Sequence, residues 1–199
     1  GEGGFISPAL NALAAAKKIG ANPAGWKLTP RQVRAAGSAG VFSSIVPTGQ
    51  MASDIWRWLI SQGLSEAGAA GVMGNLNQES TLDPSLEEVG GTGIGLVQWS
   101  FERADALRNF AAAKGTPWQD LNTQLEFFLS EINSDSTWSA MWNTLKTIND
   151  IDEATALFHD TFEKSDDRNR GIYDERPADA HNFYNNFATG VKKADGGYI

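Results

Sequence analysis

Residues 71–99, GVMGNLNQESTLDPSLEEVGGTGIGLVQW, place a helical pattern directly before a glycine-rich stretch. Val72, Leu76 and Glu79 fall at positions i, i+4 and i+7, so they share one stripe of an amphipathic helix capped by Ser65. This spacing predicts that Glu79 is buried near the helix C-terminus; the alternative is a side chain that turns out into water. Desolvation and the negative end of the helix dipole would both raise the pKa of a buried Glu79, as a general acid requires.

The chain after residue 50 predicts helices almost throughout, and therefore a mainly α fold. The exception is the stretch after Glu79, where a short β-hairpin or loop excursion is expected. The predicted helices are 53–62 with Gly63 as its stop, 65–79, 100–114 between a Ser100 cap and Gly115, one opened by the capping box Thr116–Gln119, 137–148, 150–163 with an Asp150 cap, and 176–188.

Composition divides the chain near residue 50. Residues 1–50 carry five basic residues and one acid, whereas the whole chain has a net charge of −8, so the remainder is strongly acidic. We expect an N-terminal extension or linker with short helices (1–49), a main domain (50–190) and a C-terminal tail (191–199). An acidic domain is a poor partner for nucleic acid, because binding the phosphate backbone needs a basic surface.

Several kinds of site are not expected. The chain has no Cys and two separated His, His159 and His181, so no disulfide, Cys nucleophile, Ser–His triad or zinc site is predicted. The glycines of 90–95 follow a helix instead of a strand, which argues against a dinucleotide loop. The acids of 150–153 lack the spacing of a calcium loop. No cofactor is therefore expected, and no segment approaches the roughly 18 apolar residues of a membrane span.

The residues from 73 to 103 resemble the active-site signature of the phage tail lysozyme family, within the lysozyme superfamily. The pairing of Glu-Ser with Gly-Leu-x-Gln is also similar to that of goose-type lysozymes and lytic transglycosylases. The resemblance extends over about residues 50–188 and includes Phe162-Glu163-Lys164. The matching residues are Met73, Gly74, Asn75, Glu79, Ser80, Pro84, Glu88, Gly93, Gly95, Leu96, Gln98, Trp99 and Arg103.

This resemblance implies a lysozyme-like domain that cleaves the β-1,4 bond between N-acetylmuramic acid and N-acetylglucosamine in peptidoglycan. Glu79 would be the general acid, and Gln98 a polar contact to substrate or water. For Trp99, a cleft wall and the core are equally open alternatives. The expected substrate-binding residues are Ser80, Gly93, Gly95, Gln98 and Trp99; the backbone at the glycines could approach a bulky substrate because glycine lacks a Cβ atom.

The second catalytic acid is less determined. Glycosidases commonly pair two acids, about 5 Å apart for retention and about 6.5–9.5 Å apart for inversion. Asp83, Glu87 and Glu88 are near enough in sequence, and we prefer Glu88 because it matches the family position. Asp83 is expected to serve the Asp-Pro turn and Glu87 to be solvated. A goose-type or transglycosylase-like enzyme can work without a close second acid, so Glu88 as a bystander is the alternative.

Three functions stay open at this stage. The first is a muramidase within a phage tail or another wall-penetrating protein, and the second is a lytic transglycosylase on the same scaffold. The third is a non-catalytic wall-binding or structural module. Each implies peptidoglycan glycan strands as the partner, tethering within a larger polypeptide or assembly, and a location outside the cytoplasm at the bacterial cell wall, associated with the virion.

Overall fold

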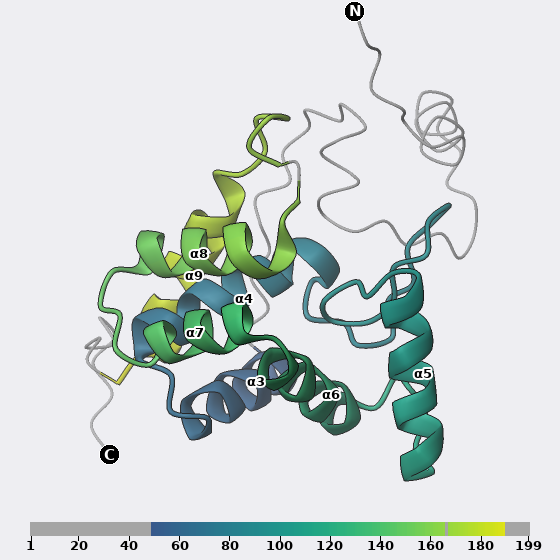
Figure 1. Ribbon diagram of the computed structural model, residues 1–199. Coiled ribbons are helices and arrows are strands. Elements are labelled where there is room, and N and C mark those ends of the chain that lie inside the picture. The colour runs from purple at the N-terminus through teal and green to yellow at the C-terminus, as the bar shows by residue number, and fades with distance from the viewer. Residues whose placement is uncertain (1–48, 166, 190–199) are drawn as a thin grey trace, which may run out of the picture.

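The computed structural model describes residues 49–165 and 167–189 of the chain (Figure 1). In this part the fold is helical, as predicted. The short helices expected before residue 49 and the tail expected from residue 191 lie outside the described residues. The elements are α3 (Gln50–Ser61), α4 (Glu66–Ser80), α5 (Glu102–Lys114), α6 (Leu121–Ser134), α7 (Ser136–Leu145), α8 (Ile151–Phe158), the π-helical turn η1 (His159–Glu163) and α9 (Glu175–Phe187).

Several predicted helix ends are confirmed by their capping contacts. Ser65 Oγ accepts a hydrogen bond from Gly68 N at the start of α4, and an Asp150 carboxylate oxygen accepts one from Glu153 N at the start of α8. Gly115 ends α5 with φ +71, a left-handed conformation that glycine adopts at little cost. Local side-chain chemistry therefore determines these boundaries.

Two predicted helix starts are wrong. α5 has Phe101, not Ser100, as its N-cap, and α6 begins five residues after Thr116. Asp120 caps α6, because its carboxylate accepts hydrogen bonds from Thr123 N and Oγ1, each 2.8 Å long. The hydrogen bond from Thr123 N holds the pKa of Asp120 below its ordinary value. A charged acceptor at a helix N-terminus is stronger than the neutral hydroxyl of Thr116.

Helix α4 is the centre of the fold and packs against α3, α7, α8 and α9 (Figure 1). The prediction of an amphipathic helix is wrong here, since every residue from Ala67 to Ser80 is buried or nearly so, polar ones included. Its polar side chains are paired inside the protein: Asn75 Nδ2, for example, donates to Gly71 O and Thr155 O. Burial on all sides is possible because these groups keep hydrogen-bond partners.

Three glycines let the neighbouring helices approach α4 closely. A Cβ atom at Gly68 would lie 2.1 Å from a backbone atom of α7. At Gly71 it would lie 2.7 Å from the backbone of α8, and at Gly74 it would lie 2.4 Å from the backbone of α9. Each glycine costs roughly 1 kcal/mol of helix propensity relative to alanine. Their lack of side chains lets three helices reach the backbone of α4, and α9 does so about one and a half turns before Glu79.

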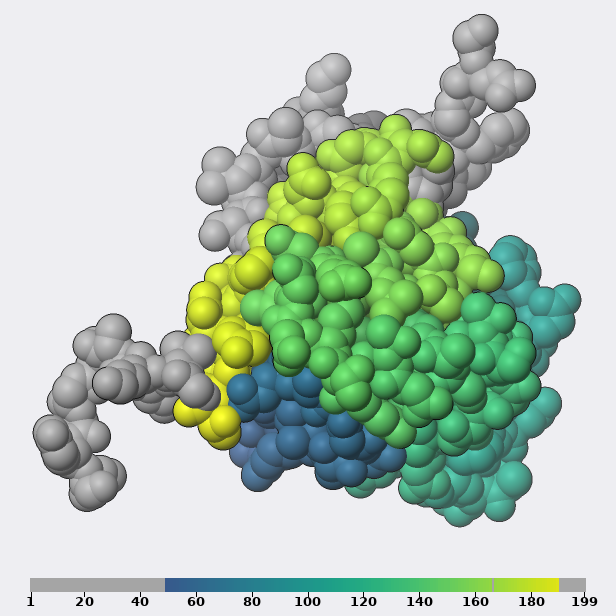
Figure 2. Space-filling model, turned by 60° about the vertical axis from the view of Figure 1, so that its left-hand side comes forward, coloured from purple at the N-terminus to yellow at the C-terminus, as the bar shows by residue number. Residues whose placement is uncertain are grey.

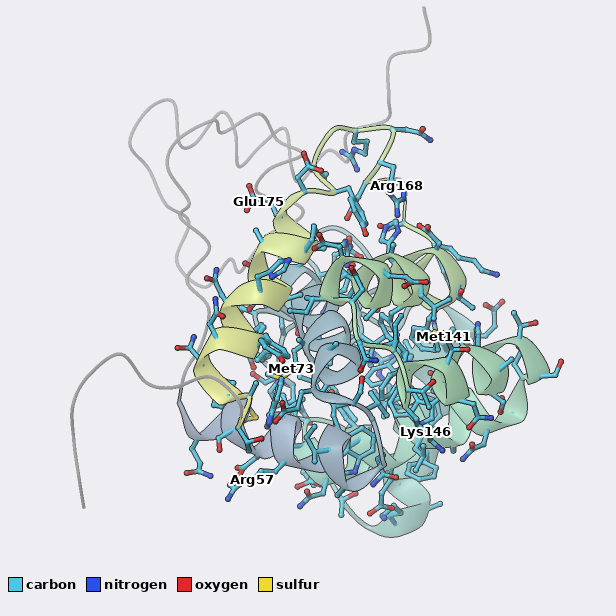
Figure 3. All side chains as sticks on the ribbon, turned by 90° about the vertical axis from the view of Figure 1, so that its left-hand side faces the viewer. Arg57, Met73, Met141, Lys146, Arg168 and Glu175 are labelled. Atoms are coloured by element: carbon cyan, nitrogen blue, oxygen red, sulfur yellow. The ribbon has the colours of Figure 1, made fainter. Side chains whose placement is uncertain are left out.

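Aromatic side chains fill the space between α3, α6, α7 and η1. Phe128 of α6 lies at the centre of this cluster, with its ring centroid 5.6 Å from that of Trp142 and 5.3 Å from that of Phe162. Figure 3 shows Met73 of α4 inside the fold, whereas Arg57 and Arg168 lie at its edge. In the space-filling view α9, in yellow, adjoins the green helices of residues 136–158 (Figure 2).

The segment from 81 to 100, between α4 and α5, is a loop. Within the described residues it contains no β-strand. The predicted β-hairpin is therefore not seen, and the alternative of a loop is what the structure has. Two isolated antiparallel bridges, Glu87 to Ile94 and Ile94 to Trp99, fold the segment back on itself twice. The part of the chain that the structure describes has no helix long and apolar enough to span a membrane.

Candidate active site

Glu79 lies in the last turn of α4 and is only 3% exposed, so its predicted burial is confirmed. Arg176, in the first turn of α9, donates a hydrogen bond from Nη2 to Glu79 Oε1 over 2.5 Å. Burial disfavours a charged carboxylate, whereas an adjacent guanidinium stabilises one. Glu79 is therefore the carboxyl group of a buried ion pair, and this partner was not predicted from the sequence.

Arg176 is fully buried and binds several groups at once. Its Nε and Nη2 atoms donate to Asp167 Oδ2 over 2.9 and 2.6 Å, and Nη1 donates to Asn75 Oδ1 over 3.0 Å. Burial by itself would lower the pKa of Arg176, but the charges of Glu79, Asp167 and Glu163 raise it well above the ordinary value. The guanidinium thus lies near three carboxyl groups, of which those of Glu79 and Asp167 are buried and that of Glu163 is half-buried.

A second set of contacts leads from this cation to the surface. Arg176 Nη2 lies 3.3 Å from Ser165 Oγ, which lies 2.8 Å from His159 Nε2. The other ring nitrogen of His159 lies 2.7 Å from Asp160 Oδ1, and Arg168 binds both oxygens of Asp160. Burial lowers the pKa of His159, with Arg176 adding to this effect and Asp160 opposing it. The imidazole is therefore held neutral by its surroundings.

The glycine-rich loop encloses the carboxylate of Glu88. Glu88 Oε2 accepts a hydrogen bond from Gly93 N over 3.1 Å, and Glu88 N donates to Gly93 O over 2.7 Å. A Cβ atom at Gly91 would lie 2.0 Å from Glu88 Oε2. The missing side chains thus make room for Glu88 itself, where the sequence suggested room for a bulky substrate.

Gln98 and Ser80 also brace this loop. Gln98, at φ +54, donates from Nε2 to Gly95 O over 2.9 Å and to Leu86 O over 3.3 Å. Ser80 Oγ donates to Leu96 O over 2.9 Å, which ties the residue after Glu79 to the loop. A Cβ atom at Gly95, whose φ is +72, would lie 2.6 Å from the side chain of Gln124. The loop is therefore tied to α4 through Ser80 and to α6 through the hydrogen bond that Leu96 N donates to Gln124 Oε1.

Trp99 is fully buried, which agrees with the core alternative for this residue. Its ring packs edge-on against Phe127, and its Nε1 donates to Glu131 Oε2 over 2.5 Å. Arg103, another residue of the matched motif, donates from Nε and Nη2 to the same carboxylate over 2.8 and 3.0 Å. These contacts anchor the end of the loop to α6.

The sequence profile of the phage tail lysozyme family matches residues 50–187, which is most of the chain. The chain belongs to the phage tail lysozyme family. It is also similar to morphogenesis protein 1 of Bacillus phage B103, with 28% identity over 121 residues. That match covers 55% of this chain and 32% of the phage protein, so the chain spans about a third of that relative's length. Family membership supports a lytic activity on peptidoglycan in general terms.

The five residues expected to contact substrate in this phage tail lysozyme domain differ in their exposure. Ser80, Gly93, Gly95 and Trp99 are buried and serve the packing of the loop. Gln98 alone of the five keeps partly exposed surface. Among the other acids weighed as a second carboxylate, Asp83 accepts hydrogen bonds from Ser85 N and Oγ and so serves the turn, as expected, and Glu87 is exposed.

Sequence reasoning missed Arg176 as the partner of Glu79, and Asp167 and His159 as further members of the network around Arg176. Arg176 and Asp167 lie roughly 90 residues or more further along the chain, so local spacing carries no information about them. One signal was present: Arg176 precedes Pro177 at the start of a predicted helix, where a cation opposes the helix dipole. A basic residue in that position indicates a nearby anion. Within the described residues no cluster of three or more His, Cys, Asp or Glu side chains could hold a metal ion.

Proposed function

We propose that this domain is a muramidase that cleaves the β-1,4 bond between N-acetylmuramic acid and N-acetylglucosamine, with Glu79 as the general acid. The observation that carries the proposal is the burial of Glu79 at the end of α4, within the stretch whose resemblance to the family signature implies that Glu79 is the acid. A muramidase of this family would work at the bacterial cell wall, as a module of a phage tail or of another wall-penetrating protein. The phage origin of its relative supports that setting.

Glu79 shares its cation with another carboxylate. Arg176 donates two hydrogen bonds to Asp167 and one to Glu79, so Asp167 is the carboxylate that binds the guanidinium more extensively. In the proposed reaction Glu79 would donate a proton to the glycosidic oxygen as the C1–O bond breaks, and water would add to C1.

A lytic transglycosylase is the second candidate. Glu88, our preferred second acid, already binds Gly93 N within its own loop. If that contact occupies Glu88 throughout the reaction, the mechanism relies on Glu79 alone. In this mechanism Glu79 first protonates the leaving oxygen, and its carboxylate then takes the proton of the sugar's own C6 hydroxyl as that oxygen attacks C1. Hydrolysis yields a reducing end and transglycosylation an anhydro-muramyl end, so product analysis distinguishes the two.

The test of the proposal is the Glu79→Gln variant in a dye-release assay on purified cell walls. We expect a folded protein whose lytic rate is lower by roughly 10²–10⁴, the usual contribution of general acid catalysis. Glu87→Gln is the matched control, because Glu87 is exposed on the adjoining loop and should be dispensable. Wall lysis at the wild-type rate by a folded Glu79→Gln protein would refute the assignment. A wild-type domain that binds walls without lysing them would instead be a wall-binding module.

A further inference from the structure

Phe101 is the most exposed large apolar side chain of the described residues, at 71%. Every other Phe, Tyr and Trp in that part of the chain is buried or partly buried. Exposed apolar surface of this kind contributes nothing to folding, because the hydrophobic effect rewards only area removed from water. Packing within the domain therefore does not explain a phenylalanine at this position.

The backbone of Phe101 is also strained. It has φ +52 and ψ −128, a conformation that glycine adopts readily and that a residue with a Cβ atom rarely does. Phe101 is the N-cap of α5, a position that Ser, Thr, Asp, Asn or Gly would occupy more favourably, and its side chain makes no capping hydrogen bond. The residue is unfavourable for the fold on two separate grounds.

Neighbouring contacts hold Phe101 in this conformation. Phe101 N donates to Thr92 Oγ1 over 3.3 Å, and Phe101 O accepts from Asp105 N in the first turn of α5 over 3.2 Å. Thr92 and Phe101 also continue the antiparallel register of the bridge between Ile94 and Trp99. Since Trp99 is buried in the core two residues earlier, the backbone that carries the exposed Phe101 ring is held in place.

The residues that hold Phe101 belong to the loop of residues 81–100, which follows α4. Thr92 directly precedes Gly93, whose N–H group binds the Glu88 carboxylate. The same loop is tied to the end of the α4 helix through the hydrogen bond between Ser80 and Leu96. Phe101 and Glu88 are therefore attached to consecutive residues, Thr92 and Gly93, of the loop that Ser80 ties to the end of α4.

We propose that the Phe101 ring is a sugar-binding platform, on which the apolar C–H face of one pyranose ring of the glycan strand stacks beside the loop of residues 88–93. The inference rests on the proposed function, which supplies the substrate class. Stacking buries the exposed ring against the sugar and so accounts for an aromatic residue where the fold favours glycine. Its role is binding, with the chemistry left to Glu79.

The first test measures binding without turnover, by co-sedimentation with purified peptidoglycan in a Glu79→Gln background. Phe101→Ala should weaken binding by roughly 10-fold or more, the value of burying one phenylalanine ring, and Phe101→Trp should retain it. Ile60→Ala is the matched control, because Ile60 is another exposed apolar residue, 37% exposed on α3. Equal binding by folded Phe101→Ala and its parent would overturn the platform.

The second test separates binding from stability. Phe101→Gly removes the ring and relieves the backbone, so it should weaken binding while raising the melting temperature by roughly 2–4 °C. A residue needed only for structure would lower the melting temperature when replaced. In the active protein, Phe101→Ala should raise KM for soluble glycan strands and leave kcat nearly unchanged. Wild-type lysis with an unchanged KM for Phe101→Ala would refute the platform alone, whereas a wild-type domain that neither binds nor lyses walls would refute the proposed function with it.

Discussion

Arg176 and Glu79, 97 residues apart in sequence, form an ion pair whose two side chains are almost completely buried. The same guanidinium binds Asp167, so it neutralises charge that the fold would otherwise hold without compensation. Arg176→Met should destabilise the domain by about 3–5 kcal/mol, because it leaves buried carboxylates without their cation. Chemical denaturation measures this loss. Arg168→Met is the control: its pair with Asp160 is largely exposed and should be worth about 1 kcal/mol or less.

Gly74→Ala tests how α9 reaches the acid. The new Cβ atom would lie 2.4 Å from Arg176 O, so the helices must separate at the point that positions the guanidinium. We expect a loss of about 1–3 kcal/mol, typical of overpacking, and a fall in lytic rate at temperatures where the variant is fully folded. Gly71→Ala disturbs α8 instead and should cost stability with a smaller loss of rate. Equal effects of the two variants on rate would contradict a specific role for the contact with α9.

The Glu88→Gln variant tests whether Glu88 is a catalytic carboxylate or a structural residue of its loop. The amide oxygen of glutamine can still accept the hydrogen bond from Gly93 N, so the loop should keep its shape. If Glu88 stabilises positive charge at the sugar carbon or positions water, kcat should fall by roughly 10²-fold while KM changes little. We expect that result. Unchanged kcat and KM would make Glu88 a structural residue, and a defect confined to KM would make it a substrate contact.

His159 predicts a dependence of stability on pH. Burial lowers its pKa below the ordinary 6.5, so the folded state binds a proton less readily than the unfolded state. The stabilisation from this residue is complete above about pH 6.5 and is lost as the pH falls through the lower pKa of the folded state. The difference in unfolding free energy between wild type and His159→Gln, measured from pH 8 to pH 5, should therefore shrink in acid. A difference that stays constant would contradict a neutral buried imidazole.

Deletion of residues 1–48 tests the proposed domain boundary. The family match begins at residue 50, and α3 begins there with Gly49 as its N-cap. We expect the shortened chain to fold and to lyse walls at the rate of the full chain. Aggregation, or a much lower melting temperature, would mean that the deleted segment is part of the domain.

Local patterns in the sequence determined much of the helical framework. Ser65, Asp150 and Gly115 act within a few residues of themselves, so their caps and stops could be read directly. The burial of Glu79 was predicted from its place on the stripe with Val72 and Leu76, and it is observed, although α4 is buried on all sides and not along that stripe alone. Short-range errors arose where two residues competed for one role, as when the charged Asp120 replaced Thr116 as a cap.

Only the tertiary structure decided what surrounds the acid. Hydrogen bonds and ion pairs depend on distance in space, and Arg176 reaches Glu79 because Gly74 lacks the Cβ atom that would hold α9 away. The glycine-rich loop also depends on close approach in space, since its missing side chains make room for Glu88 and Gln98. The sequence by itself determined which residue is the candidate acid and that it is buried. Its charge partners required the packing of α9 on α4, because no local pattern encodes a contact between helices so far apart in the chain.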